Sequence, residues 1–297
     1  MISAAKINLG LNVLYKREDG YHEIQSVFIR INWGDEISFF PDNSGKITLT
    51  SKNELGSFKR ESFEAVCERG DFRKNILFKA YTQISDIIGF SAGIHIQLTK
   101  KIPTGGGLGG GSSNAASLIR YMLNQSSVVL TEALVQKISK IGADIPFFLT
   151  TDHALVGGIG EKILPIKISP GFGVLAIPDV SINTSELYSQ LKKPLQKAGT
   201  QNSWDKLEWE ISDSLRTGNW KFLQEKLKNE FEEPVFRSCP ELAVIKKNFL
   251  KCGAEYSSMT GSGSCLYALT SKSTEQIEIH QKMQRLHPEM EMILFEF

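Results

Sequence analysis

The 297-residue sequence contains few cysteines and histidines, and their spacing argues against several kinds of site. The four cysteines form no C-x-x-C pair, which is typical of unpaired thiols in a reducing compartment. The five histidines include no H-E-x-x-H pattern, so a zinc ion held by protein ligands is not expected. The sequence therefore favours neither a disulfide-stabilised protein nor a zinc enzyme.

The chain also lacks a strong charge of either sign and any long apolar run. Its net charge is +1, so there is no basic stripe of the kind that nucleic acid requires and no acidic tail. No apolar run reaches membrane-spanning length, and a strand is predicted almost from the first residue, which leaves no signal peptide. With 41% apolar and 23% charged residues, we expect a globular, cytoplasmic protein with no nucleic-acid or membrane partner.

Glycine, in contrast, is concentrated in one stretch. Residues 100–114 read KKIPTGGGLGGGSSN, between a strand predicted from alternating apolar residues at 94–98 and a helix predicted at 115–124. Ser112 and Ser113 are expected to cap that helix. Glycines let backbone N–H groups close around a bulky anion, and a helix start adds unpaired N–H donors. The stretch predicts a phosphate-binding loop, with a flexible linker as the alternative.

The order of residues in this loop argues against several nucleotide-binding motifs. No Lys-Ser or Lys-Thr closes the glycine run, as a P-loop requires, and the chain has no H-R-D, D-F-G or V-A-I-K motif of protein kinases. Gly105, Gly107 and Gly110 fit G-x-G-x-x-G. The acidic residue expected about 20 residues further on, however, falls at Glu132, in the first turn of another predicted helix. A dinucleotide-dependent dehydrogenase is therefore disfavoured.

Two charged residues outside the loop are candidates for catalysis. Lys6 lies on a strand predicted over residues 6–13, with Asn8 on the same polar face. Asp144 lies between apolar neighbours, where a carboxylate is not expected to stay unpaired. From the residues alone, Lys6 can also be a solvated lysine, and Asp144 can cap a turn before Pro146.

The rest of the chain mixes strands with helices, which indicates an α+β fold. Further strands are expected at 24–31, 35–40, 173–177, 265–269 and 291–295, with a turn between two strands at 157–161. Helices are expected at 75–88, 131–141, 184–191, 204–216, 220–230, 241–252 and 274–286. Residues 51–73 are expected to form a loop with at most a short helix, and residues 196–203 a polar linker.

The loop and five further motifs together resemble the GHMP kinases, a family of small-molecule kinases. In the family's order, the further motifs are A-K-I-N-L at 5–9, D-G-Y-H at 19–22, G-A-D-I-P-F at 142–147, G-I-G-E at 158–161 and M-T-G-S-G-S at 259–264. The D-G-Y-H motif is similar to that of the branch acting on a cytidine-diphosphate-linked methylerythritol. Another kinase of the family, or a nucleotide-binding protein without turnover, remains an alternative.

The resemblance implies a two-domain GHMP kinase fold. The N-terminal domain, residues 1–165, would resemble domain 2 of ribosomal protein S5 and carry the ATP loop, and residues 166–297 would form a ferredoxin-like domain. The implied reaction transfers the γ-phosphate of ATP to the tertiary 2-hydroxyl of the methylerythritol compound, in the non-mevalonate isoprenoid pathway. Mg²⁺ is expected to arrive with ATP, without an assigned protein ligand.

The resemblance also implies roles for individual residues. Lys6 and Asp144 form the implied catalytic pair, in which the carboxylate takes the hydroxyl proton and the ammonium keeps the carboxylate ionised. ATP binding is implied for Pro103, Thr104, Gly105, Gly106, Gly107, Leu108, Gly109, Gly110, Gly111, Ser112 and Ser113, and, on the adenine side, for Asn75 and Lys100. Binding of the cytidine-bearing substrate is implied for Asn8, Tyr21, His22, Thr184 and Tyr188.

Overall fold

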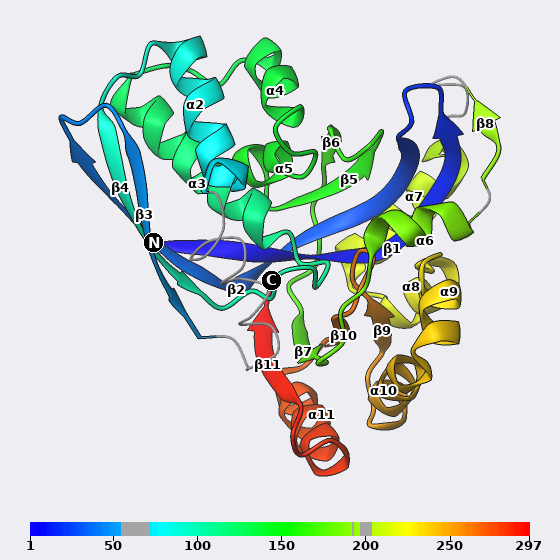
Figure 1. Ribbon diagram of the computed structural model, residues 1–297. Helices are drawn as coiled ribbons and strands as arrows, with labels where there is room; N and C mark the ends of the chain where they lie inside the picture. The colour runs from blue at the N-terminus through cyan, green and yellow to red at the C-terminus, as the bar shows by residue number, and fades with distance from the viewer. Residues whose placement is uncertain (55–71, 192, 197–203) are drawn as a thin grey trace. The chain divides into compact units, whose positions relative to one another are not determined.

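The computed structural model describes residues 1–54, 72–191, 193–196 and 204–297, which form a mixture of helices and sheets (Figure 1). The chain divides into two compact units, each made of several segments. Unit 1 consists of residues 1–5, 33–104 and 109–151, and unit 2 of residues 6–32, 105–108 and 152–297. Two long strands, β1 (Ile2–Arg17) and β2 (His22–Asp42), therefore contribute residues to both units.

Unit 1 combines parts of β1 and β2 with two further strands and a set of helices. Strand β4 (Gly93–Lys100) pairs antiparallel with the second half of β2 and parallel with β3 (Ile47–Asn53). The helical segments are η1 (Phe72–Lys74), α2 (Ile76–Ile88), α3 (Gly110–Gln125), α4 (Glu132–Ser139) and α5 (Ile145–Thr150). Helix α3 packs against both α2 and α5, so the helix that follows the glycine loop is central to this unit.

Helix α2 lies within the predicted range 75–88, and a residue with a specific local role flanks it at each end. The Asn75 side chain accepts a hydrogen bond from the Leu77 N–H at 2.9 Å, which satisfies one of the unpaired donors of the first turn. The helix ends at Gly89, whose φ of 68° is a left-handed conformation that glycine adopts without steric cost.

Helix α3 begins earlier than predicted. It starts at Gly110, after Gly109 with a φ of 70°, so Ser112 and Ser113 lie in its first turn and the prediction that they cap it is wrong. The Ser113 hydroxyl instead accepts a hydrogen bond from the Ser3 hydroxyl at 2.8 Å. Glycine is a poor helix former, and the glycine run therefore obscured the true start.

Strand β2 was predicted as two strands, but it is continuous through Gly34. A Cβ at Gly34 would lie 2.2 Å from the Ser3 carbonyl oxygen. The glycine therefore permits close approach of neighbouring backbone rather than a turn.

Unit 2 contains two groups of strands. In the first, β5 (His153–Gly157) pairs antiparallel with the first half of β2 and with β6 (Lys162–Pro165), and β1 pairs with the short β8 (Leu195–Gln196). The second is a four-stranded antiparallel sheet in the order β11-β7-β10-β9. Its strands are β7 (Phe172–Ile177), β9 (Tyr256–Met259), β10 (Leu266–Thr270) and β11 (Glu291–Glu296).

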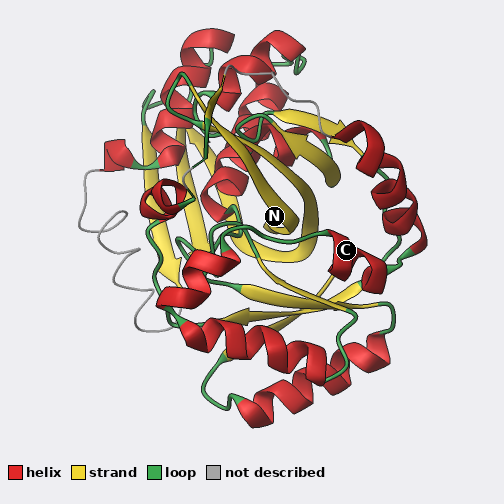
Figure 2. Ribbon diagram, turned by 90° about the vertical axis from the view of Figure 1, so that its right-hand side faces the viewer, coloured by secondary structure: helices red, strands yellow, loops and turns green. Residues whose placement is uncertain are grey.

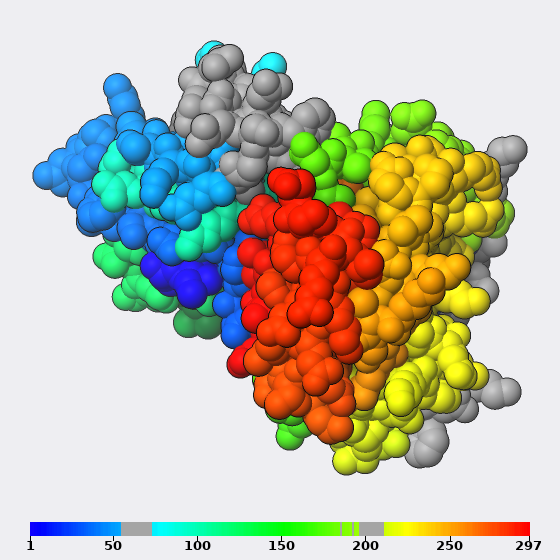
Figure 3. Space-filling model, turned by 90° about the horizontal axis from the view of Figure 1, so that it is seen from below, coloured from blue at the N-terminus to red at the C-terminus, as the bar shows by residue number. Residues whose placement is uncertain are grey.

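Two helices, α10 (Pro240–Lys251) and α11 (Ser273–Leu286), pack on this four-stranded sheet. Figure 2 shows them beneath the sheet, and Figure 3 shows them side by side on the outer surface. The order β7, α10, β9, β10, α11, β11 with this strand order is the predicted ferredoxin-like arrangement. Its core includes Val174, Ala176, Leu242, Phe249, Leu266, Ile279 and Met283.

The remaining helices of unit 2 lie between β7 and α10 in the sequence. They are α6 (Thr184–Gln190), α7 (Trp204–Thr217), α8 (Trp220–Lys226) and α9 (Glu232–Ser238). Helix α8 ends four residues before the predicted position, and α9 was not predicted.

Of the segments predicted as loop or linker, residues 51–53 belong to β3 and Gln196 to β8. Residues 55–71 and 197–203 lie outside the described residues.

Candidate active site

The glycine loop connects β4 to α3, which confirms the predicted strand–loop–helix context. Gly105, Gly107 and Gly109 have φ values of 75°, 76° and 70°, a backbone conformation that residues with a Cβ rarely adopt. Along the chain these glycines directly precede the start of α3, where unpaired N–H groups and the helix dipole favour an anion. This geometry suits a polyphosphate.

Residues 105–108 belong to unit 2, where they contact a second glycine-rich loop. A Cβ at Gly107 would lie 2.0 Å from the carbonyl oxygen of Thr260, and the Thr260 hydroxyl donates to the Gly107 carbonyl at 3.1 Å. The Lys6 N–H donates to the Leu108 carbonyl at 3.0 Å. The glycine loop is therefore held against β1 and against residue 260.

Lys6 and Asn8 lie next to each other on β1, as the alternation predicts. Lys6 is 4% exposed, which contradicts the interpretation of a solvated lysine. Its ammonium donates a hydrogen bond to Asn8 Oδ1 and lies 4.6 Å from the centre of the Phe28 ring. The Asn8 N–H donates to the Thr260 hydroxyl at 3.1 Å, and the Asn8 side-chain amide donates to Ser26 Oγ at 3.0 Å.

Asp144 directly precedes α5 in unit 1. Within α5, all of which the structure describes, no N–H donates a capping hydrogen bond to the Asp144 side chain, which argues against the interpretation of a simple cap. Pro146 in the first turn has no N–H to donate. Asp144 and Lys6 belong to different units, and their action as a pair stays a prediction.

A pocket of about 580 Å³ in unit 2 brings together most of the residues predicted to bind the cytidine-bearing substrate. The His22 ring stacks on the Tyr188 ring with centroids 4.6 Å apart, and Tyr188 contacts the Phe231 ring edge-on. Tyr21, also in the pocket wall, is 59% exposed. The full lining is Lys16, Gly20, Tyr21, His22, Ile159, Tyr188, Ser189 and Lys193.

Two predicted substrate residues, Asn8 and Thr184, are not part of this lining. Thr184 instead shares a hydrogen bond of 2.7 Å with Ser262 of the second glycine-rich loop. Conversely, sequence reasoning did not assign Lys16, Ile159, Ser189 or Lys193 to the substrate site. The signal for Ile159 was its place in the G-I-G-E motif, but nothing in the sequence pattern singled out the two lysines.

The electrostatics of the pocket favour a neutral His22. Burial lowers the pKa of His22 below its ordinary value, and repulsion from the Lys16 ammonium lowers it further. Arg17 holds the adjacent turn, with Nη2 2.7 Å from Asp19 and Nη1 3.4 Å from Glu23. The Tyr21 N–H donates to Asp19 at 3.1 Å, so this turn is fixed by its own charged residues.

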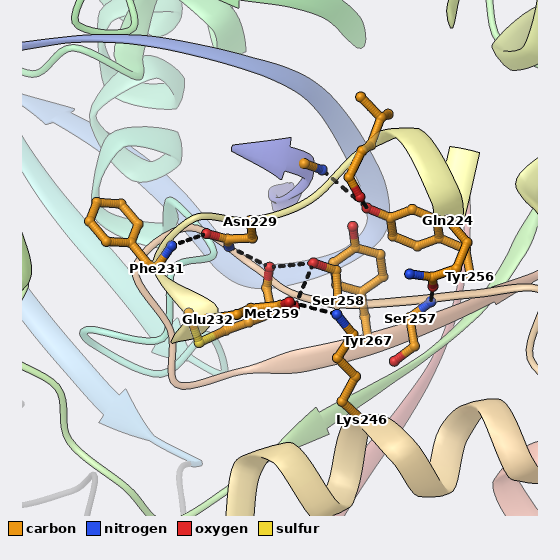
Figure 4. Close-up of polar contacts among 12 residues, drawn as sticks. Gln224, Asn229, Phe231, Glu232, Lys246, Tyr256, Ser257, Ser258, Met259 and Tyr267 are labelled. Atoms are coloured by element: carbon orange, nitrogen blue, oxygen red, sulfur yellow. Dashed lines mark hydrogen bonds and ion pairs between the residues drawn. The ribbon is translucent and has the colours of Figure 1, made fainter. Parts of the chain in front are cut away.

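A buried network supports the second glycine-rich loop (Figure 4). The Asn229 side-chain amide donates to the carbonyls of Met259 and Gly261, both at 2.8 Å. Glu232 accepts from the Met259 N–H at 2.9 Å and forms an ion pair of 2.6 Å with Lys246. Sequence reasoning missed these residues, because polar side chains next to an apolar helix pattern are usually solvent-exposed.

Burial in unit 2 also raises the pKa of Tyr267 well above its ordinary value. The hydroxyl therefore stays protonated, and it donates to the Asn8 carbonyl at 2.6 Å. The strand that carries Lys6 and Asn8 is thus tied to the four-stranded sheet.

The two residues predicted on the adenine side have structural partners. Asn75 caps α2, and the Lys100 ammonium lies 2.5 Å from Asp35 Oδ2.

Among the described residues, no group of three His, Cys, Asp or Glu side chains is arranged to hold a metal ion. No helix in the described part of the chain is both long and apolar enough to cross a membrane.

Comparison with known proteins identifies the family. Residues 75–151 match the model of the GHMP kinases N terminal domain, and residues 211–289 match the GHMP kinases C terminal model. The 4-diphosphocytidyl-2-C-methyl-D-erythritol kinase of Leptospira interrogans is 42% identical over the full length of both chains. The enzyme of the same name from Leptospira biflexa is 39% identical over all of this chain and 98% of its own.

Solved structures agree with this result. The crystal structure of a 4-(cytidine 5'-diphospho)-2C-methyl-D-erythritol kinase superposes with a TM-score of 0.76 and 26% identity, over 100% of this chain and 98% of the other. Mevalonate kinase of L. major shares the fold with a TM-score of 0.70, at 14% identity over 99% and 94% of the two chains. The chain therefore belongs to the GHMP kinases and, within them, to the 4-diphosphocytidyl-2-C-methyl-D-erythritol kinase family.

Proposed function

We propose that this chain transfers the γ-phosphoryl group of ATP to the 2-hydroxyl of 4-diphosphocytidyl-2-C-methyl-D-erythritol, in the non-mevalonate isoprenoid pathway. The chain is an ATP-dependent small-molecule kinase of the family identified above. The observation that carries the choice of substrate is the pocket in which His22 stacks on Tyr188 beside Tyr21. Such a pocket suits a flat, polar base.

The chemistry of this pocket favours a pyrimidine. Tyr21 and Tyr188 offer aromatic faces on which a base can stack. A neutral His22 has one ring nitrogen that donates a hydrogen bond and one that accepts, so it can form a hydrogen bond with the polar edge of a base. A kinase for homoserine, mevalonate or a simple sugar has no need of such a platform.

We propose that Asp144 and Lys6 carry the chemical step. The 2-hydroxyl oxygen forms a bond to the γ-phosphorus, the bond between that phosphorus and the β–γ bridging oxygen breaks, and ADP leaves. The hydroxyl proton passes to the Asp144 carboxylate. The Lys6 ammonium keeps the carboxylate ionised and offsets charge on the transferring group.

The remaining assignments concern ATP and the organisation of the chain. The glycine loop would bind the phosphates, and we propose that Mg²⁺ arrives with ATP and neutralises their charge.

We propose residues 1–165 and 166–297 as the two family domains. The two family models fall on either side of this boundary, which supports it. A cytoplasmic location is also proposed, since ATP is supplied there.

An ADP-release assay tests the substrate. We expect turnover with the cytidine-linked methylerythritol and a large loss of kcat/KM with the same alcohol lacking cytidine, while homoserine, mevalonate and galactose give no signal. Equal turnover with and without cytidine would contradict the role of the pocket. ATP binding without ADP release on any acceptor would support a nucleotide-binding protein that has lost catalysis.

The same assay tests the catalytic base. Asp144→Asn should reduce kcat by at least about 100-fold, the usual scale of general-base catalysis, and leave ATP affinity by calorimetry within a few fold. Asp152→Asn is the matched control, because Asp152 is a largely exposed carboxylate paired with Arg30. Near-normal turnover of Asp144→Asn would remove Asp144 from the mechanism.

A further inference from the structure

The segments on either side of the glycine loop contact a buried carboxylate, Asp35, that no motif singled out. Asp35 lies on β2 and is 0% exposed. A buried carboxylate is costly unless it is paired and hydrogen-bonded. What it contacts therefore indicates what it stabilises.

The hydrogen bonds to Asp35 come from both sides of the loop. Before the loop, Oδ1 accepts from the N–H groups of Lys101 and Ile102, both at 2.7 Å, and Oδ2 lies 2.5 Å from the Lys100 ammonium. After the loop, the Asn114 side-chain amide donates to Oδ2 at 2.9 Å. We call Asp35, Lys100, Lys101, Ile102 and Asn114 the Asp35 cluster.

The cluster joins the two ends of the phosphate loop. β4 leads into the loop at Lys100, and the loop ends in α3, which carries Asn114 (Figure 1). A Cβ at Gly110 would come within 3.0 Å of the Lys100 ammonium, so the start of α3 passes directly over the ion pair. The loop before α3, residues 103–109, therefore lies between two chain segments that share one carboxylate.

We propose that Asp35 is a positioning residue for ATP: it fixes both ends of the glycine loop in the phosphate-binding conformation. This inference rests on the proposed function. A glycine-rich segment loses much conformational freedom when it closes around a ligand. Fixing its ends in advance reduces the free-energy cost of binding nucleotide, whereas the alcohol pocket, built from other segments, gains nothing from it.

The test compares Asp35→Asn with Glu36→Gln. Asp35→Asn removes the charge that pairs with Lys100, whereas Glu36→Gln removes a neighbouring carboxylate that is 56% exposed and paired with Lys101. Asp35→Asn should raise the ATP dissociation constant by calorimetry, and the KM for ATP, by about tenfold or more. The KM for the alcohol should stay within about twofold, and Glu36→Gln should behave as wild type.

Asn114→Ala tests the other end of the loop and guards against failure of Asp35→Asn to fold. Alanine is a good helix former, and this substitution leaves the Asp35–Lys100 pair intact. It should weaken ATP binding about threefold or more, again without a matching change in the KM for the alcohol.

The outcomes separate the inference from the proposed function. If Asp35 has only a structural role, Asp35→Asn will lower the denaturation midpoint, and the KM values for ATP and for the alcohol will stay unchanged or rise equally. That result would overturn the inference, and so would wild-type ATP affinity in Asn114→Ala. Absence of ATP turnover in the wild-type chain would instead contradict the proposed function. ATP-selective weakening from both ends of the loop supports the positioning role.

Discussion

At the scale of single residues, the folded environment of His22 favours its neutral ring. Burial and the nearby Lys16 both disfavour the imidazolium, so the neutral ring persists below the pH at which a free imidazole titrates. Because the folded chain binds this proton less tightly than the unfolded chain, the contribution of His22 to stability is present above pH 6.5. That contribution is lost as the pH falls through the lower folded pKa.

The same shift predicts how substrate binding depends on pH. The KM for the cytidine-linked alcohol should be constant down to about pH 6.5 and rise below it, as His22 becomes protonated. In Lys16→Met one of the two causes of the shift is gone, so the rise should begin at a higher pH. NMR titration of the His22 ring measures the midpoint directly. A wild-type midpoint at or above 6.5 would contradict the prediction.

The candidate residues differ in how far the sequence could identify them. Lys6, His22 and Tyr188 were predicted because motifs or aromatic type mark them, and the structure buries the first and stacks the other two. Asp35 and Asn229 were not predicted, because their role depends on partners that lie far away in the sequence. A single Asp or Asn beside apolar residues gives no sign of which carbonyls or N–H groups it will meet.

At the scale of elements, the contact between the two glycine-rich loops constrains the first of them. Gly107→Ala combines an unfavourable φ of 76° with an overlap against the Thr260 carbonyl. Gly105→Ala is the matched control, because Gly105 has a φ of 75° but its Cβ would meet no described atom within 4 Å.

We therefore expect Gly105→Ala to lower the free energy of unfolding by about 1–2 kcal/mol, the cost of a left-handed residue with a Cβ. Gly107→Ala should cost clearly more, since the loop at 260 must also move. Chemical denaturation of the two variants measures the difference. Equal losses would mean that the contact between the loops is not rigid.

Regular elements were predicted where one face is apolar, as in α2 and β4. Some elements that are very short or buried throughout were missed, since they carry no periodic pattern, although β10, also buried throughout, was predicted. Strand β9, with all four residues buried, and helix α5, with six residues, are examples. The secondary structure of such segments depends on tertiary packing, which a local sequence pattern does not show.

At the scale of the whole molecule, the compact units do not follow the order of the chain. Unit 2 includes residues 6–32 and 105–108 in addition to everything after 151. Its core cluster contains Leu11, Val13 and Ile24 together with residues from the four-stranded sheet. The fold class followed from the mixture of strands and helices, but this interleaving of segments could not be read from sequence periodicity.

The interleaving predicts the behaviour of fragments. Residues 166–297 expressed alone lack the β1 and β2 segments of their own core, so we expect no cooperative thermal transition by circular dichroism. Co-expression with residues 1–165 supplies those segments and should restore a cooperative transition, as in the intact chain. A sharp transition of the isolated fragment would show that its sheet and helices suffice.

The contact of Gly107 with Thr260 also has a consequence for biosynthesis. The first glycine-rich loop leaves the ribosome long before residue 260 has been made. Until then, the backbone at 107 lacks both the hydroxyl that donates to it and the carbonyl against which it packs. The glycine loop of the nascent chain can thus reach its mature conformation only after most of the message has been translated.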